Sequence, residues 1–161
     1  MKRPLTFTSV VILVLVFSGV LLAQSNPALG TWKLDLAKSK YSPAGTAPKS
    51  DVLIYEAQGD GVKVSSNGVA WDGSRIAFSF ATNYDGKDSA VSGTGFPNAA
   101  DTIAVKRIDS NTSTATGKKA GKVVYTRRLV VSKDGKVMTI TAKGTDEQGH
   151  PTSSTSVWEK Q

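Results

Sequence analysis

Cysteine is absent from all 161 residues, and histidine occurs once, as His150. The chain can therefore form no disulfide and has no thiol nucleophile, and a zinc site would lack its usual donors. A serine nucleophile needs a base within hydrogen-bonding distance, whereas His150 lies beside Pro151 in a predicted turn. We therefore expect a protein that is not an enzyme, holds no metal and uses no cofactor.

Long apolar runs are also scarce, with one exception near the start of the chain. Lys2 and Arg3 precede an apolar stretch over 10–22, and small residues follow at Ala23 and Ser25. This order predicts a signal peptide over 1–25, removed on export to the periplasm or the medium. An uncleaved membrane anchor is the alternative, but the run is shorter than the roughly 20 apolar residues that cross a bilayer. Residues 26–161 should then form one domain without a membrane span.

Acidic residues are outnumbered by basic ones, and the formal charge is +7. Without Lys2 and Arg3, 18 Lys and Arg against 13 Asp and Glu leave +5. Nucleic-acid binding needs a basic groove lined with aromatics, but here the lysines are scattered through predicted turns. We expect a monomer with no nucleic-acid partner. Acidic pairs at 85/88 and 146/147 are explained by turn chemistry, although a metal ion is the alternative.

A helical period is missing after residue 25, where short runs rich in Val, Ile, Thr and aromatics alternate with turn signals. Four of these signals accept the positive φ of a type I′ hairpin turn: Asn67-Gly68, Asp72-Gly73, Asp85-Gly86 and Asp134-Gly135. The predicted strands are 30–36, 51–57, 61–66, 68–72, 74–83, 87–92, 102–109, 111–117, 121–133, 136–143 and 152–160.

These strands predict an all-β fold, an antiparallel up-and-down β-barrel of about eight to ten strands, because closure removes exposed strand edges. A sandwich of two sheets is the alternative. Prolines and small residues make 37–50 a loop, and we expect the loops 42–50, 93–100 and 144–151 to surround the mouth.

Alternation within the strands predicts which side chains point into the barrel. In one strand the inner set is Val123, Tyr125, Arg127, Leu129 and Val131. The same rule selects three further inner sets: Ile76, Phe78 and Phe80; Ile103, Val105 and Arg107; Met138, Ile140 and Ala142. A buried arginine needs an acceptor, which is either a structural partner or the acid group of a ligand held by apolar walls. Candidate ligand-binding residues are Phe78, Phe80, Arg107, Tyr125, Arg127 and Met138.

The stretch Gly30-Thr31-Trp32-Lys33-Leu34 resembles the G-x-W signature of lipocalins and the start of fatty-acid-binding proteins, which are both calycin barrels. With the segment 37–41, Asp-Gly-Lys at 85–87 and 134–136, and the ending 157–160, the chain resembles small exported bacterial proteins with a lipocalin-like domain. The resemblance implies a β-barrel that binds a small apolar molecule, with Trp32 plugging the closed end.

The resemblance also adds Trp158 to the candidate ligand-binding residues, because fatty-acid-binding proteins carry an aromatic in their last strand. Where those proteins have an arginine two residues earlier, this chain has Ser156, and a proline-containing loop replaces their helical lid.

Together these patterns favour an exported lipocalin-like barrel that binds or carries a small, mainly apolar or amphipathic ligand without catalysis. The alternative is a periplasmic interaction or envelope stress module, with a filled core and its function on the mouth loops. An inward carboxylate near Arg107 or Arg127 would instead support an enzyme.

Overall fold

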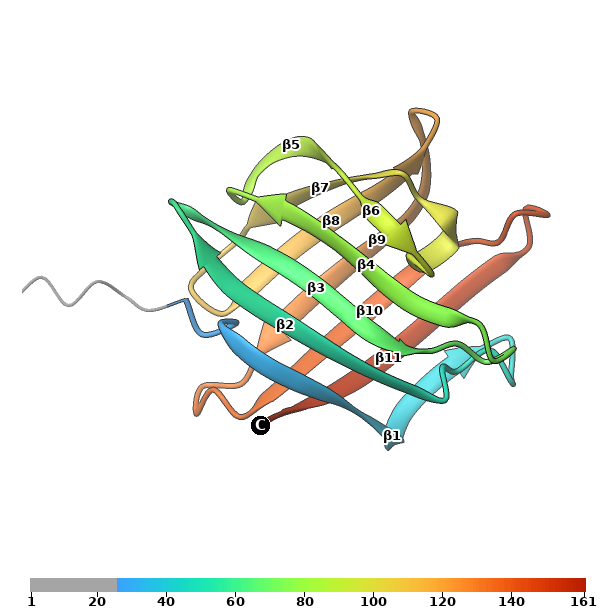
Figure 1. The fold of residues 1–161 in the computed structure, drawn as a ribbon, viewed down its shortest axis with the longest axis horizontal. Helices are drawn as coiled ribbons and strands as arrows, with labels where there is room; N and C mark the ends of the chain where they lie inside the picture. Colours follow the sequence, from blue (N-terminus) through green and yellow to red (C-terminus); the bar gives the residue numbers. More distant parts are fainter. Residues whose placement is uncertain (1–25) are drawn as a thin grey trace, which may run out of the picture.

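The computed structural model describes residues 26–161, so the predicted signal peptide lies outside the described residues. Eleven strands form one antiparallel sheet that curls into a nearly closed barrel (Figure 1). Their bounds are β1 Gly30–Ser42, β2 Ser50–Gln58, β3 Gly61–Val69, β4 Arg75–Thr82, β5 Asp85–Ala90, β6 Ser92–Thr94, β7 Thr102–Arg107, β8 Thr112–Lys119, β9 Lys122–Val131, β10 Val137–Thr145 and β11 Pro151–Lys160. A short 3₁₀ helix, η1, spans Pro97–Ala99. Within this part of the chain no helix is long and apolar enough to cross a membrane.

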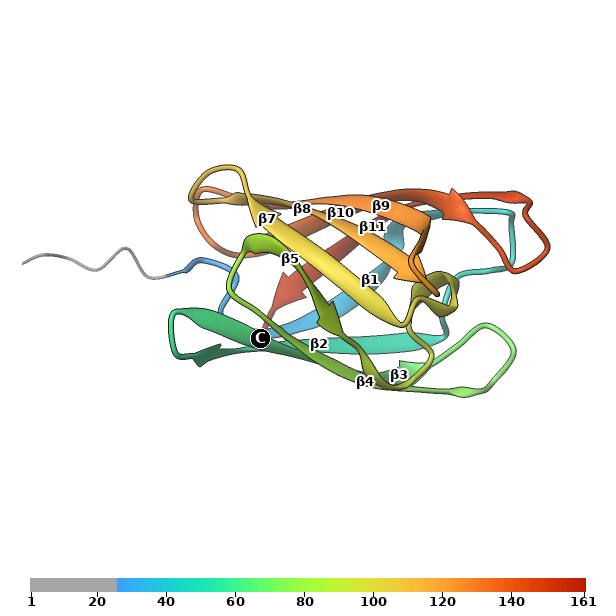
Figure 2. The ribbon, with the colours of Figure 1, turned by 90° about the horizontal axis from the view of Figure 1, so that it is seen from above.

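The sheet order is β5-β7-β8-β9-β10-β11-β1-β2-β3-β4-β6, so β5 and β6 are its two edges. These edge strands follow each other in the chain, and together they act as one bent strand. β5 pairs with β7, and β6 pairs with β4, which brings the two edges of the sheet together (Figure 2). The predicted all-β barrel is confirmed, and its eleven strands exceed the predicted eight to ten because this bend divides one strand into two.

Two of the four predicted turns are correct, and two are wrong. Asp72-Gly73 and Asp134-Gly135 lie in the β3–β4 and β9–β10 turns. Asn67-Gly68 instead lies within β3, paired with Val52 and Asp51. The Asp85-Gly86 turn falls two residues earlier, where Tyr84 itself takes a positive φ of 58°. Local turn propensity is overridden in both cases by pairing with a neighbouring strand.

Alternation places most of the predicted inner residues correctly, including Ile76, Phe78, Phe80, Ile103 and Val105, which are all buried. Val123 is a wrong prediction, since 58% of it is exposed. The β8–β9 register shifts between Gly117 and Lys118, and such a bulge reverses the face of the residues beyond it. The predicted loop 37–50 is also too long, because β1 continues to Ser42.

Both ends of the barrel are covered by the chain itself. At the floor, where β1 begins, the Trp32 indole N–H donates a 2.7 Å hydrogen bond to the Ala28 carbonyl oxygen. Trp32 is completely buried, so its predicted role at the closed end fits its position. At the mouth lie the loops 43–49, 95–101 and 146–150, close to the expected positions.

Candidate functional site in the barrel interior

An aromatic cluster fills the interior below the mouth. Phe78 and Phe80 of β4 and Tyr125 of β9 surround Phe96, with ring centroids 4.7, 5.9 and 6.1 Å from it. Phe96 is only 8% exposed although it comes from a loop. Sequence reasoning placed this loop at the mouth but missed its insertion; a lone aromatic between Gly95 and Pro97 was the available signal.

The loop that carries Phe96, residues 95–101, is here named the Phe96 loop. Asn98 and Ala99 adopt left-handed φ angles of 54° and 51°, which cost an L-residue roughly 1–2 kcal/mol each. The Asn98 side-chain amide donates to the Thr145 carbonyl oxygen and, at 3.1 Å, to Thr152 Oγ1. The loop is therefore held to β10 and β11 by Asn98, and its end is held to β8 and the β8–β9 turn by hydrogen bonds of Asp101 with Lys118 and Ala120. Its two left-handed residues carry backbone strain.

Arg127 lies in the middle of β9, between the inward residues Tyr125 and Leu129, and is half-buried. Its guanidinium Cζ is 5.9 Å from the centroid of the Phe80 ring. Among residues 26–161 it forms neither an ion pair nor a side-chain hydrogen bond. Arg127 is thus the inward charge that alternation predicted. One interpretation of that charge required a structural partner, and the described part of the chain contains none.

Two buried tyrosine hydroxyls, those of Tyr55 and Tyr125, also lack a hydrogen-bond partner within the described residues. Burial raises the pKa of Tyr55 to about 12. The positive charge of Arg127 has the smaller, opposite effect and lowers that pKa. Burial likewise raises the pKa of Tyr125, and Arg127 again opposes it. Both phenols therefore stay protonated at neutral pH and keep a free O–H to donate.

Tyr125 is held in place by glycines on both neighbouring strands. It is paired with Gly117 of β8 and with Gly144 of β10. A Cβ added to Gly117 would lie 2.0 Å from Tyr125 Cε1, so the ring occupies the space that any side chain there would need. These two glycines are thus required by the position of the tyrosine ring.

Four of the seven predicted ligand-binding residues come together around this interior: Phe78, Phe80, Tyr125 and Arg127. Met138 and Trp158 are buried and paired with each other in the β10–β11 register. The Trp158 indole N–H donates to Ser156 Oγ at 2.9 Å, so its polar group is already satisfied.

Arg107 does not lie in the interior. It is exposed at the floor end, and its guanidinium Cζ lies 4.0 Å from the centroid of the Tyr84 ring. The predicted inward position is wrong. Arg107 is the last residue of β7, so its side chain lies at the end of the strand, where the barrel no longer encloses it. Sequence reasoning in turn missed Tyr55, although alternation with Leu53 would have placed it inside.

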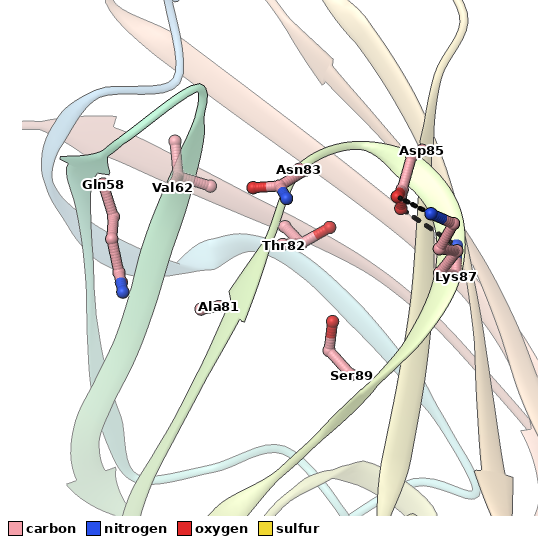
Figure 3. A pocket seen from close by; sticks show the side chains of 8 residues that line it. All are labelled: Gln58, Val62, Ala81, Thr82, Asn83, Asp85, Lys87 and Ser89. Carbon is pink, nitrogen blue, oxygen red and sulfur yellow. Dashed lines mark hydrogen bonds and ion pairs between the residues drawn. The ribbon is translucent and has the colours of Figure 1, made fainter.

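A separate groove of about 400 Å³ lies at the seam between β4 and β5 (Figure 3). It forms because β5 turns away from β4 to pair with β7, and β6 pairs with β4 only farther along. Exposed polar side chains dominate its lining, but the groove also reaches the buried residues Val62 and Thr82. Its complete lining is Gln58, Val62, Ala81, Thr82, Asn83, Asp85, Lys87 and Ser89.

A metal ion was the alternative explanation for the acidic pairs 85/88 and 146/147. Local hydrogen bonds and one ion pair account for two of these four residues. Asp85 accepts a backbone hydrogen bond from Lys87 and pairs with the ammonium of that lysine at 3.5 Å. Asp146 accepts hydrogen bonds from the backbone N–H groups of Gln148 and His150. Within residues 26–161 no group of three or more His, Asp or Glu side chains is placed so that it could hold a metal ion.

Comparisons with known proteins support the fold. No protein-family model matches the chain, and a search of curated proteins finds no match. Zebrafish ileal bile acid-binding protein, solved in complex with cholic acid, is similar over 84% of this chain and 99% of that chain, with 14% identity and a TM-score of 0.51. A redesigned β-barrel, mFAP1, bound to DFHBI, matches over 83% of this chain and 95% of its own, with 11% identity and a TM-score of 0.41. At this identity the zebrafish structure shows the fold alone, and it confirms the antiparallel β-barrel.

Proposed function

We propose that this protein binds a small amphipathic molecule inside its barrel, with an acidic group at Arg127 and an apolar part among the aromatic side chains, and that it catalyses no reaction. The observation that carries the proposal is the set of unpaired polar groups in the interior: the Tyr55 and Tyr125 hydroxyls and the half-buried guanidinium of Arg127.

These three groups are all hydrogen-bond donors and have no acceptor in the described chain. Leaving a buried polar group unpaired costs about 1–3 kcal/mol, more for a charged group. A ligand carboxylate accepts several hydrogen bonds and binds arginine with charge-assisted ones. Phe78 and Phe80 supply the apolar wall. The zebrafish protein of the same fold was solved with cholic acid, which is consistent with a small molecule as the ligand.

Phe96 must leave the aromatic cluster before such a ligand can bind, because its ring takes the space between Phe78, Phe80 and Tyr125. The backbone strain at Asn98 and Ala99 favours this movement, while hydrogen bonds of Asp101 to Lys118 and Ala120 anchor the far end of the loop. Binding would then exchange the Phe96 ring for the apolar part of the ligand.

Calorimetric titration of the purified protein with octanoate tests the proposal. We expect saturable binding of one octanoate per chain, weakened about tenfold or more in Arg127→Gln, because a hydrogen bond to a charged group contributes about 1.5–3 kcal/mol. Arg128→Gln is the matched control, since the adjacent Arg128 is exposed and carries the same charge. Equal binding by the two variants, or no binding by the wild type, would overturn the proposal.

Export is a further part of the proposal, together with a monomeric state. It is supported by the basic start, apolar stretch and small residues of 1–25. Expression of the full chain in a bacterial host, followed by cell fractionation and N-terminal sequencing, tests it. We expect a periplasmic or secreted product that starts near residue 26 and elutes as a monomer; an intact chain in the cytoplasm would contradict it.

A second candidate function is an interaction module that works through its mouth loops. The observation that favours it is the closed mouth, where Phe96 is buried in the core. It predicts that octanoate does not bind, and that a stoichiometric protein partner binds the wild type but not a variant with residues 43–49 replaced by glycine and serine.

A further inference from the structure

Asp51 is a carboxylate on the inner face of the barrel, near the mouth. Along β2 the buried residues are Asp51, Leu53 and Tyr55, so Asp51 shares the inward face. It is 9% exposed. Ser66 Oγ of β3 donates a 2.6 Å hydrogen bond to Asp51 Oδ1. No lysine, arginine or histidine among residues 26–161 forms an ion pair with it.

The surroundings leave this carboxylate without a compensating charge. Burial raises the pKa of Asp51, with the Ser66 hydroxyl and the Val52 backbone N–H opposing. The neighbouring titratable group is Tyr41 of β1, whose pKa is raised to about 12 by burial, with Ser156 opposing and the charge of Asp51 adding to the rise. Tyr41 is thus neutral at physiological pH and supplies no positive charge.

The backbone beside the carboxylate leaves room for it. Asp51 is paired with Gly68, and a Cβ at that position would lie 3.0 Å from Asp51 Oδ1. One carboxylate is too few ligands for a calcium or magnesium ion, which take six or more oxygens or waters. A protonated amine, by contrast, is satisfied by one carboxylate and neighbouring hydroxyls, such as those of Ser66 and Tyr41.

We propose that Asp51 receives a protonated amine of the bound molecule, so that the ligand is amphoteric, with an amine at Asp51 and an acidic group at Arg127. The inference rests on the proposed function. Asp51 on β2 and Arg127 on β9 are four strand steps apart in the sheet. β2 and β9 lie on opposite sides of the barrel (Figure 2). The inner face of the barrel therefore carries one carboxylate and one guanidinium on strands that face each other.

Titration at pH 8 with octylamine, octanol and octanoate tests this assignment, because the three probes share a chain of eight carbons and differ in the charge of the head group. We expect octylamine to bind the wild type at least about tenfold more tightly than octanol, as a charge-assisted pair requires. In Asp51→Asn, whose side chain still accepts the Ser66 hydrogen bond, the two should bind equally. Ser66→Ala keeps the carboxylate and should keep the preference for octylamine.

A wild-type measurement covers the case in which Asp51→Asn does not fold. Burial raises the pKa of Asp51, so lowering the pH from 8 to 4 shifts Asp51 toward its protonated form while octylamine stays charged, and the preference over octanol should fall. Octylamine binding no better than octanol at pH 8, or a preference that is undiminished in Asp51→Asn or at pH 4, would overturn the inference while octanoate binding leaves the proposed function standing. Failure of octanoate to bind would refute the proposed function itself.

Discussion

Replacing Tyr55 by Phe should make the protein more stable and its ligand binding weaker. The Tyr55 hydroxyl is fully buried and has no hydrogen-bond partner among the described residues. Removing it relieves a desolvation cost, for which we expect a gain of about 1 kcal/mol in the free energy of unfolding. For a domain of this size the gain corresponds to a rise of about 3–5 °C in the melting temperature.

Denaturant unfolding and calorimetric titration with octanoate measure the two effects on the same variant. Tyr84→Phe is the matched control, because the Tyr84 hydroxyl accepts a 3.1 Å hydrogen bond from Asn26 Nδ2. That variant should lose about 0.5–1.5 kcal/mol of stability. It should also bind octanoate like the wild type, since the Tyr84 ring packs against the exposed Arg107 and is not part of the aromatic cluster around Phe96.

The opposite sign for Tyr55→Phe would refute this reasoning. A loss of 1 kcal/mol or more would mean that the hydroxyl has a partner in the folded protein. A stability gain with unchanged octanoate affinity would mean that the hydroxyl lies outside the ligand site.

Three further substitutions test the packing of the barrel. Phe96→Ala should lower the free energy of unfolding by about 3 kcal/mol, at the lower end for a buried phenylalanine because its loop can relax. It should also tighten octanoate binding at least about tenfold, and an unchanged or weaker affinity by calorimetry would contradict displacement of the Phe96 ring by the ligand. Gly117→Ala, whose new Cβ meets the Tyr125 ring, should cost about 1–3 kcal/mol in urea unfolding, and an unchanged midpoint would argue against this ring position. Trp32→Phe removes a buried hydrogen bond and should lower the free energy of unfolding by about 1–3 kcal/mol. Trp71→Phe, at a site 58% exposed, is the control and should change it by less than about 0.5 kcal/mol. Equal effects of the two substitutions would place Trp32 outside the core.

Alternation predicted the inner faces of the strands wherever the ladder is regular. The set Ile76, Phe78 and Phe80 is correct because β4 pairs with β3 without interruption. Val123 is wrong because a register shift lies beside it, and one extra residue in a strand exchanges the two faces. Such a shift depends on how two strands pair, which the pattern of one strand does not contain.

The candidate site was predictable in part for the same reason. Inward residues such as Tyr125 and Arg127 follow from the period of one strand. That Tyr55 lies near Tyr125 and Arg127 depends on how the sheet closes into a barrel. The insertion of Phe96 depends on how its loop folds back over the mouth. Both are long-range features without a local signal. The Asp51 carboxylate was likewise left unassigned, because its burial depends on the neighbouring strands.

The most direct test of ligand binding at Arg127 is a ¹³C NMR titration of the protein with octanoate labelled at its carboxyl carbon. In the wild type we expect a shifted carboxyl signal that saturates at one octanoate per chain. In Arg127→Gln the same signal should need about tenfold or more octanoate to reach half-saturation, whereas Arg128→Gln should match the wild type. A wild-type spectrum that shows free octanoate alone, or an identical bound signal in Arg127→Gln, would contradict the account.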